Sequence, residues 1–115
     1  MTEIPAVNEK RFFERFGARF PAKLKDSRED FGEKIYLRNA CAQGAQLACK
    51  DHVYVNDTLT VEVKVPQMTY PLTMRGKVVW VKKELANFWE VGMQFHQINF
   101  MNLSKLYESA QDIYL

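Results

Sequence analysis

Apolar and polar residues alternate most regularly in Leu59-Thr60-Val61-Glu62-Val63-Lys64-Val65. Successive side chains of a β-strand point to opposite faces, so this pattern places four apolar residues on one face and three polar residues on the other. Pro66 follows directly, and proline has no N–H to donate to a neighbouring strand. The segment therefore predicts a strand with one buried face that ends at Pro66.

The same alternation recurs on both sides of this segment. Further strands are predicted over Ala18–Leu24, Lys34–Ala40, Ala45–Cys49, Leu72–Lys82 and Trp89–Gln97. Short stretches rich in Asn, Asp, Gly and Gln separate them and are typical of turns. Six strands joined by turns, with no helical periodicity between them, predict an antiparallel sheet that closes into a small barrel or folds as a sandwich.

The spacing of apolar residues changes near the C-terminus. They recur there at intervals of three and four, as on one face of a helix: Leu103, Leu106, Tyr107, Ala110, Ile113 and Tyr114. Asn99 or Asn102 has the side chain of a helix N-cap. We expect a helix of about three to four turns whose apolar face packs on the barrel.

Length and composition indicate one globular domain. The chain has 115 residues, of which 47% are hydrophobic and 26% charged. We assign residues 10–115 to a single domain and expect residues 1–9 to form a flexible N-terminal arm. No apolar run approaches the roughly 20 residues that cross a bilayer, and no signal-peptide pattern is present. The sequence thus predicts a cytoplasmic protein with no membrane span.

Motifs of enzymes and metal sites are missing from the sequence. It contains no His-Glu-x-x-His, no glycine-rich phosphate loop and no nucleophile elbow. Two cysteines, Cys41 and Cys49, and two histidines, His52 and His96, are too few and too scattered for a zinc site. We expect no enzymatic activity, no metal and no cofactor.

Positive charge is concentrated near the N-terminus. Between Asn8 and Arg28, seven basic residues minus three acidic residues give +4, whereas the whole chain carries +2. Arg11 and Arg15 lie in this segment, just before the first predicted strand. Two guanidinium groups four residues apart can converge on one anion, and each offers a planar fork of donors to phosphate oxygens or to a guanine edge.

A second polar segment, Asn39-Ala40-Cys41-Ala42-Gln43-Gly44, connects two predicted strands. Asn39 offers two donors and an acceptor. Gly44 either adopts a positive φ angle or lets a ligand approach the backbone closely. Taken alone, the segment is better interpreted as a hairpin turn with Asn39 and Gly44 in turn roles.

Together these segments resemble the PilZ domain family, whose members are receptors for the bacterial second messenger cyclic di-GMP. Arg11 and Arg15 match the family's Arg-x-x-x-Arg motif, and Asn39 and Gly44 match the outer positions of its Asp/Asn-x-Ser-x-x-Gly motif. Three strands are also similar to family strands: Phe20–Leu24, Gly76–Trp80 and Val91–Phe95. The resemblance covers about residues 10–112 and implies a six-stranded antiparallel β-barrel with a C-terminal α-helix.

The resemblance also implies a function. Cyclic di-GMP is expected to bind Arg11, Arg15, Asn39, Cys41 and Gly44, with the N-terminal arm folding over the ligand. Such ordering changes the surface that the domain presents, so the signal would be relayed by conformational change to a downstream protein partner. Nucleic acid polymers are not among the expected partners.

Cys41 departs from the motif, because the family has Ser at this position. A thiol donates and accepts hydrogen bonds weakly, and one lost contact lowers affinity by roughly tenfold. The alternative function is therefore a PilZ-fold adaptor that binds a protein partner and no nucleotide.

Two further alternatives depend on the basic segment. Arg15 and Arg19 have the same spacing as Arg11 and Arg15. We prefer Arg11 and Arg15, since Arg19 then falls on the polar face of the first strand. A small barrel that binds single-stranded nucleic acid would use the same segment, but that interpretation leaves Asn39 and Gly44 unexplained.

Overall fold

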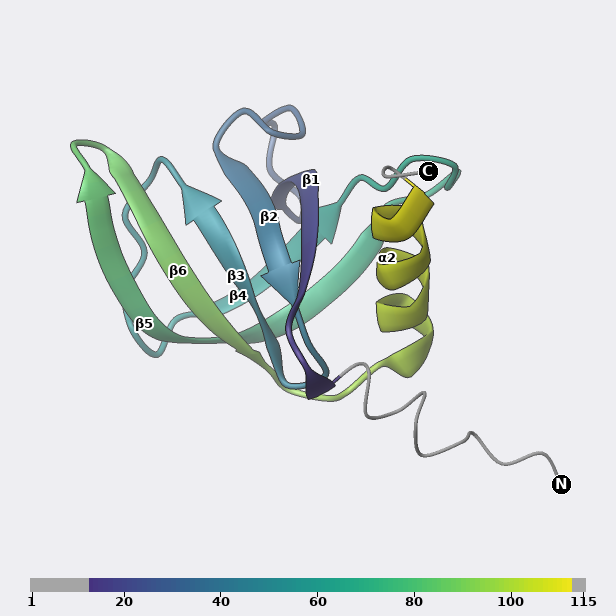
Figure 1. Cartoon of the computed structure of the whole chain (residues 1–115). Coiled ribbons are helices and arrows are strands. Elements are labelled where there is room, and N and C mark those ends of the chain that lie inside the picture. The colour runs from purple at the N-terminus through teal and green to yellow at the C-terminus, as the bar shows by residue number, and fades with distance from the viewer. Residues whose placement is uncertain (1–12, 113–115) are drawn as a thin grey trace, which may run out of the picture.

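The computed structural model describes residues 13–112 and forms a closed antiparallel barrel with one long helix at its side (Figure 1). Arg11, the predicted arm over residues 1–9 and the last helical positions, Ile113 and Tyr114, lie outside the described residues. Within residues 13–112 the elements are β1 (Phe16–Leu24), β2 (Ile35–Ala40), β3 (Gly44–Cys49), β4 (Thr58–Val63), β5 (Leu72–Leu85), β6 (Phe88–Phe95) and α2 (Phe100–Asp112).

The strands follow the order β1-β2-β3-β6-β5-β4 around the ring, and every neighbouring pair is antiparallel. The ring closes between β1 and β4 through the pairs Ala22–Val63, Lys23–Glu62 and Leu24–Val61. The predicted six-stranded barrel with a C-terminal helix is thus confirmed.

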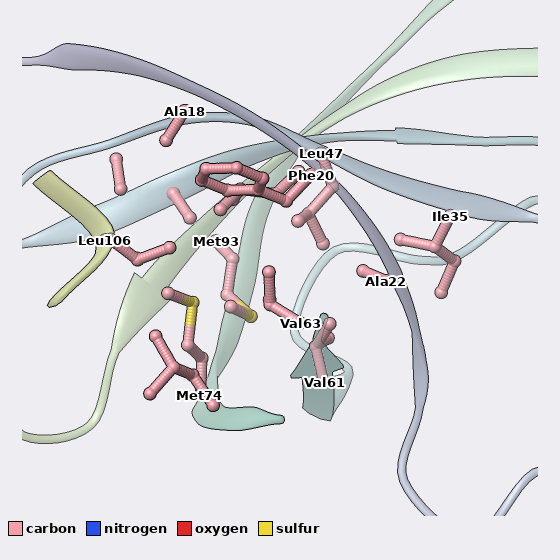
Figure 2. Packing of buried hydrophobic residues seen from close by; sticks show 14 of the residues in the cluster. Ala18, Phe20, Ala22, Ile35, Leu47, Val61, Val63, Met74, Met93 and Leu106 are labelled. Carbon is pink, nitrogen blue, oxygen red and sulfur yellow. The ribbon is translucent and has the colours of Figure 1, made fainter. Parts of the chain in front are cut away.

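The barrel interior is filled by the apolar face of each strand. Ala18, Phe20 and Ala22 of β1 are buried, and the intervening Arg19 is exposed, as the alternation predicts. Figure 2 shows these three residues lying around one cluster with Met74 and Met93, whose flexible thioethers fill its centre.

Helix α2 completes this core from the side. Asn99 is its N-cap, because the Asn102 backbone N–H donates to Asn99 Oδ1 at 3.0 Å. Leu103, Leu106 and Ala110 are buried against the barrel, and Leu106 reaches into the cluster in Figure 2. A helix that packs its apolar face on the barrel is therefore confirmed.

Several strand boundaries differ from the predicted ones by one to three residues, for example at β4 and β5. β4 ends at Val63, two residues before the predicted end. β5 runs to Leu85 and extends past Lys82, because Leu85 still pairs with Phe88 and the chain reverses through Asn87 at a φ of 57°. Asparagine tolerates this left-handed conformation better than most residues. The result is a long β5–β6 hairpin that projects from the barrel on the side opposite α2 (Figure 1).

No helix within residues 13–112 is long and apolar enough to cross a membrane.

Candidate functional site

A row of residues runs across the outer face of the barrel, one from each of five adjacent strands. The register pairs Gly17 with Asn39, Asn39 with Gln46, Gln46 with Gly92, and Gly92 with Trp80. Two glycines keep the row shallow, and its polar groups come from Asn39 and Gln46. We call this set the cross-strand row.

Asn39 reaches the outer face because β2 contains a bulge. Leu37 pairs with Leu47 of β3, and Asn39 pairs with Gln46, the residue adjacent to Leu47. Arg38 lies between these two pairs and is therefore an extra residue in β2. Leu37 and Ala40 are both fully buried, whereas Arg38 and Asn39 between them line a surface groove. Strict alternation from Leu37 would have pointed Asn39 into the core.

Asn39 is the centre of a short hydrogen-bond chain. Arg15 Nη1 donates to Asn39 Oδ1 at 2.7 Å, and Asn39 Nδ2 donates to Gln46 Oε1 at 2.8 Å. Arg15 lies immediately before β1, so the basic segment and the polar segment predicted from the sequence meet at this point.

Two grooves adjoin the chain Arg15–Asn39–Gln46. The larger has a volume of about 1050 Å³ and extends over the outer face of β1, β2 and β3. The smaller, of about 270 Å³, lies over β3, β6 and β5, where Trp80 and Gly92 line it. Arg15 and Gln46 line both grooves, so the hydrogen-bond chain separates one from the other.

The charge of the larger groove is mainly positive. Arg15, Arg19, Lys34 and Lys50 line it together with one glutamate, Glu90. Lys34 forms an ion pair of 3.1 Å with Asp51, and the hydrogen bond and charge of Asp51 raise the pKa of Lys34. Basic side chains beside a concave surface favour an anionic ligand.

Arg38 is already paired on this face. Its guanidinium donates to Glu84 of β5 at 2.6 Å and to Glu90 of β6 at 2.5 Å, and it lies 5.6 Å from the centre of the Phe88 ring. The hydrogen bond from Arg38 holds the pKa of Glu84 below its ordinary value. Arg38 therefore ties the β5–β6 hairpin to β2 and contributes little uncompensated charge to the groove.

Gly44 is required for a structural reason that adds to the two predicted ones. Gly32 is the glycine with a positive φ angle within residues 13–112, so that explanation of Gly44 is wrong. A Cβ atom on Gly44 would lie 2.1 Å from the carbonyl oxygen of Met93 in β6. Close approach of two strands thus requires glycine here, while Gly44 also lines the smaller groove.

Cys41 lies beneath the site surface. Its backbone N–H donates to the Gly44 carbonyl at 2.9 Å and its carbonyl accepts from the Gly44 N–H at 3.3 Å, which closes the β2–β3 hairpin. The residue is 5% exposed and is not among the residues that line either groove. The hairpin turn interpretation of this segment is therefore confirmed alongside the surface position of Asn39.

Among the predicted site residues, the structure brings Arg15 and Asn39 together, sets Gly44 at the edge of the smaller groove and buries Cys41. Arg11 lies outside the described residues. Sequence reasoning missed Gln46 and the surface position of Trp80. Val78 is buried, and regular alternation would place Trp80 on the same face. Val79 is an extra residue in β5, which turns Trp80 outward, and the indole then covers Gly92. A bulge leaves no clear pattern in a single sequence.

Within residues 13–112, no group of three or more His, Cys, Asp or Glu side chains is arranged to hold a metal ion. The site offers hydrogen-bond donors, the amide oxygens of Asn39 and Gln46 as acceptors, and positive charge, which are the groups of a binding surface.

Comparison with known proteins identifies the family. The family model of the PilZ domain matches residues 9–109, so this chain belongs to the PilZ domain family. Among solved structures, the Bacillus subtilis Inhibitor of motility (MotI/DgrA) is similar, with a TM-score of 0.57 and 11% sequence identity over 87% of this chain and 49% of that chain. This chain therefore spans about half the length of MotI, and the likeness concerns the fold. No curated protein matches the sequence.

Proposed function

We propose that this domain binds cyclic di-GMP on the outer face of β1, β2 and β3 and relays binding to a protein partner in the cytoplasm. The proposal depends on one observation above all. The hydrogen bond between Arg15 and Asn39 joins the two family motifs, which are 24 residues apart in the chain, at the edge of a basic groove.

The chemistry of the groove fits this ligand class. Cyclic di-GMP is a dianion that carries two guanine bases, so its site needs cations for the phosphates and a defined polar group for a base. Arg15, Arg19, Lys34 and Lys50 supply positive charge, and Asn39 supplies the polar group. A guanidinium also binds phosphate in a bidentate manner and stacks on aromatic bases.

Each motif residue then has a defined role. When the ligand binds, Arg15 gives up its hydrogen bond to Asn39. It then contacts a phosphate or the O6/N7 edge of guanine. Asn39 Oδ1 is thereby freed and accepts a hydrogen bond from guanine. Gly44 lets the β2–β3 hairpin lie close to β6, and buried Cys41 shapes the hairpin from beneath. The role of Arg11 as a second clamp comes from its match to the motif.

Relay to a partner follows from the position of Arg15. It directly precedes β1, so a change of its bonding partner alters the position of Phe13 and Glu14, the described residues before it. The equilibria of ligand binding and of this rearrangement share a coupling free energy. A protein that recognises the rearranged surface would therefore bind this domain according to the concentration of the messenger. The domain would act by binding alone and would need no cofactor.

Calorimetric titration of the full chain with cyclic di-GMP at moderate salt tests the proposal. We expect a dissociation constant in the micromolar range or below. Arg15→Ala should weaken binding by about 10- to 100-fold, since it removes charge-assisted hydrogen bonds. Arg28→Ala is the matched control, because it removes one exposed guanidinium outside the groove and should change affinity by less than about threefold.

Absence of heat with the wild-type chain at several hundred micromolar ligand would overturn the proposal. Equal weakening by the two arginine variants would show that general positive charge, and not the site at Asn39, attracts the messenger.

A protein-interaction adaptor without nucleotide binding is the second candidate. The observation that favours it is Cys41, which is buried and replaces the family's Ser with a weaker hydrogen-bonding group. The structural neighbour MotI is named as an inhibitor of motility, which is a regulatory role. Capture of a partner to the same extent with and without cyclic di-GMP, combined with a silent titration, would favour this function.

A further inference from the structure

Gln46 contacts the group that the proposed function assigns to base recognition. It lies in β3 between Asn39 of β2 and Gly92 of β6, and its side chain is half-buried. Gln46 Oε1 accepts a hydrogen bond from Asn39 Nδ2 at 2.8 Å. Because β3 is paired on both sides, the backbone that carries this side chain is held firmly in the sheet.

The orientation of the Asn39 carboxamide follows from its two partners. A guanidinium can donate hydrogen bonds but cannot accept them, so the Asn39 atom that faces Arg15 must be Oδ1. Nδ2 therefore faces Gln46, which in turn presents Oε1. When Arg15 moves to a ligand, Gln46 is the remaining partner of the Asn39 carboxamide, and Oδ1 can turn away from the groove only if the Gln46 carboxamide rotates at the same time.

We propose that Gln46 is a positioning residue that makes the site select guanine over adenine, an inference that rests on the proposed function. With Nδ2 held by Gln46, Asn39 presents an acceptor to the incoming base. Guanine carries donors at N1 and at its 2-amino group, so its edge satisfies that acceptor. Adenine offers a single donor on this edge, its 6-amino group, beside an unprotonated N1 whose lone pair repels Oδ1, whereas guanine offers two adjacent donors.

Without Gln46, rotation of the Asn39 carboxamide removes the discrimination between guanine and adenine. A carboxamide that has no fixed partner turns by about 180° at little cost and offers Nδ2 in place of Oδ1. An amide that presents either group accepts guanine and adenine with more similar affinity. Selectivity is the difference between the affinities for guanine and for adenine, and Gln46 would act mainly by lowering the affinity for adenine.

The test measures the affinities of cyclic di-GMP and cyclic di-AMP for the full chain and for two variants. Both ligands are dianions, so their affinity ratio is insensitive to charge introduced at position 46. Gln46→Leu removes the acceptor at similar volume, and we expect the ratio to fall by about five- to tenfold. Gln46→Glu keeps an acceptor for Asn39 Nδ2, and we expect it to retain most of the wild-type ratio even if both affinities fall.

The control is Gln97→Leu, which removes a glutamine side chain at the groove beside the start of α2 and should leave the ratio unchanged. Thermal unfolding of each variant reports whether the fold is intact. If the wild type binds cyclic di-GMP and Gln46→Leu keeps the same ratio, the role of Gln46 is disproved while the proposed function stands. If the wild type binds neither ligand, the proposed function itself fails.

Discussion

Gly44 illustrates how one backbone position sets the geometry of the site. It begins β3 beside β6, and the Met93 carbonyl oxygen occupies the space that a Cβ atom would need. Gly17 in the cross-strand row is different, because a Cβ atom there would meet no atom within 4 Å. The two glycines therefore provide a matched pair that differs in available space.

Gly44→Ala should lower the free energy of unfolding by about 3 kcal/mol, because the added methyl group forces β3 and β6 apart. Gly17→Ala should change it by less than about 1 kcal/mol and in the stabilising direction, since it reduces the entropy of the unfolded chain. Urea denaturation of both variants measures the difference. Equal stability of the two would contradict the assigned role of Gly44.

Residue types could be predicted at the site from sequence, but the direction of their side chains could not. Arg15 and Asn39 were found by their motifs. Gln46 carries no motif, and its place beside Asn39 depends on the strand register, which a bulge at Arg38 shifts. Trp80 shares the spacing of core residues with Val78, and the bulge at Val79 turns it to the surface.

At the scale of elements, the β5–β6 hairpin is the segment that extends furthest from the helix (Figure 1). Its outer residues are mostly exposed, and Leu85 near the tip is 68% exposed. The bonds from Arg38 to Glu84 and Glu90 therefore connect the hairpin to β2, next to Asn39. The hairpin should depend on this ion cluster for its local order.

Arg38→Met should increase amide hydrogen exchange in the hairpin tip, Ala86–Phe88, at pH 7. The pKa of Glu84 lies below its ordinary value of 4.5, so its contribution is present above that pH and is lost as the pH falls through the lowered pKa. The difference between wild type and variant should thus shrink as the pH falls below 4.5 and through the lowered pKa of Glu84. Lys77→Met, which alters an exposed residue far from the tip on the same strand, is the control.

A difference in exchange that persists after Glu84 has been protonated would contradict this assignment, because it would mean that the ion pairs do not order the tip.

At the scale of the whole molecule, the ring is joined most weakly between β1 and β4. Three residue pairs connect these strands, whereas eight connect β5 and β6. β1 is also the strand that Arg15 precedes. Opening of this junction would leave β1 paired with β2, where Gly17 lies opposite Asn39, so the proposed ligand site depends on the β1–β2 pairing and not on closure of the ring.

Cyclic di-GMP should therefore slow amide hydrogen exchange where β1 pairs with β2, at Gly17 and Asn39, more than at the β1–β4 junction, at Lys23 and Glu62. Ligand that binds only while β1 and β2 are paired slows their separation by up to about 100-fold when its concentration is 100 times the dissociation constant. Exchange measured by mass spectrometry with and without ligand checks this, with Arg15→Ala as the control. Protection confined to the β1–β4 junction would contradict the position of the site.

The barrel and its helix could be predicted because their signals repeat. Alternation along six segments and the three-to-four spacing after Asn99 each report one buried face, and burial of that face dominates the free energy of folding. The ends of β4 and β5 were less predictable, since they depend on local pairing and on the φ angle of Asn87.

The bulges at Arg38 and Val79 have a consequence for how relatives of this chain are aligned. Each adds one residue inside a strand, and the residues on its two sides would keep their partners and their faces if that extra residue were left out. Deleting Arg38 or Val79 would therefore remove the bulge, whereas deleting a residue elsewhere in the strand would turn the remainder of the strand inside out. Insertions and deletions that separate distant family members are therefore to be placed at these positions within β2 and β5 as well as in the loops.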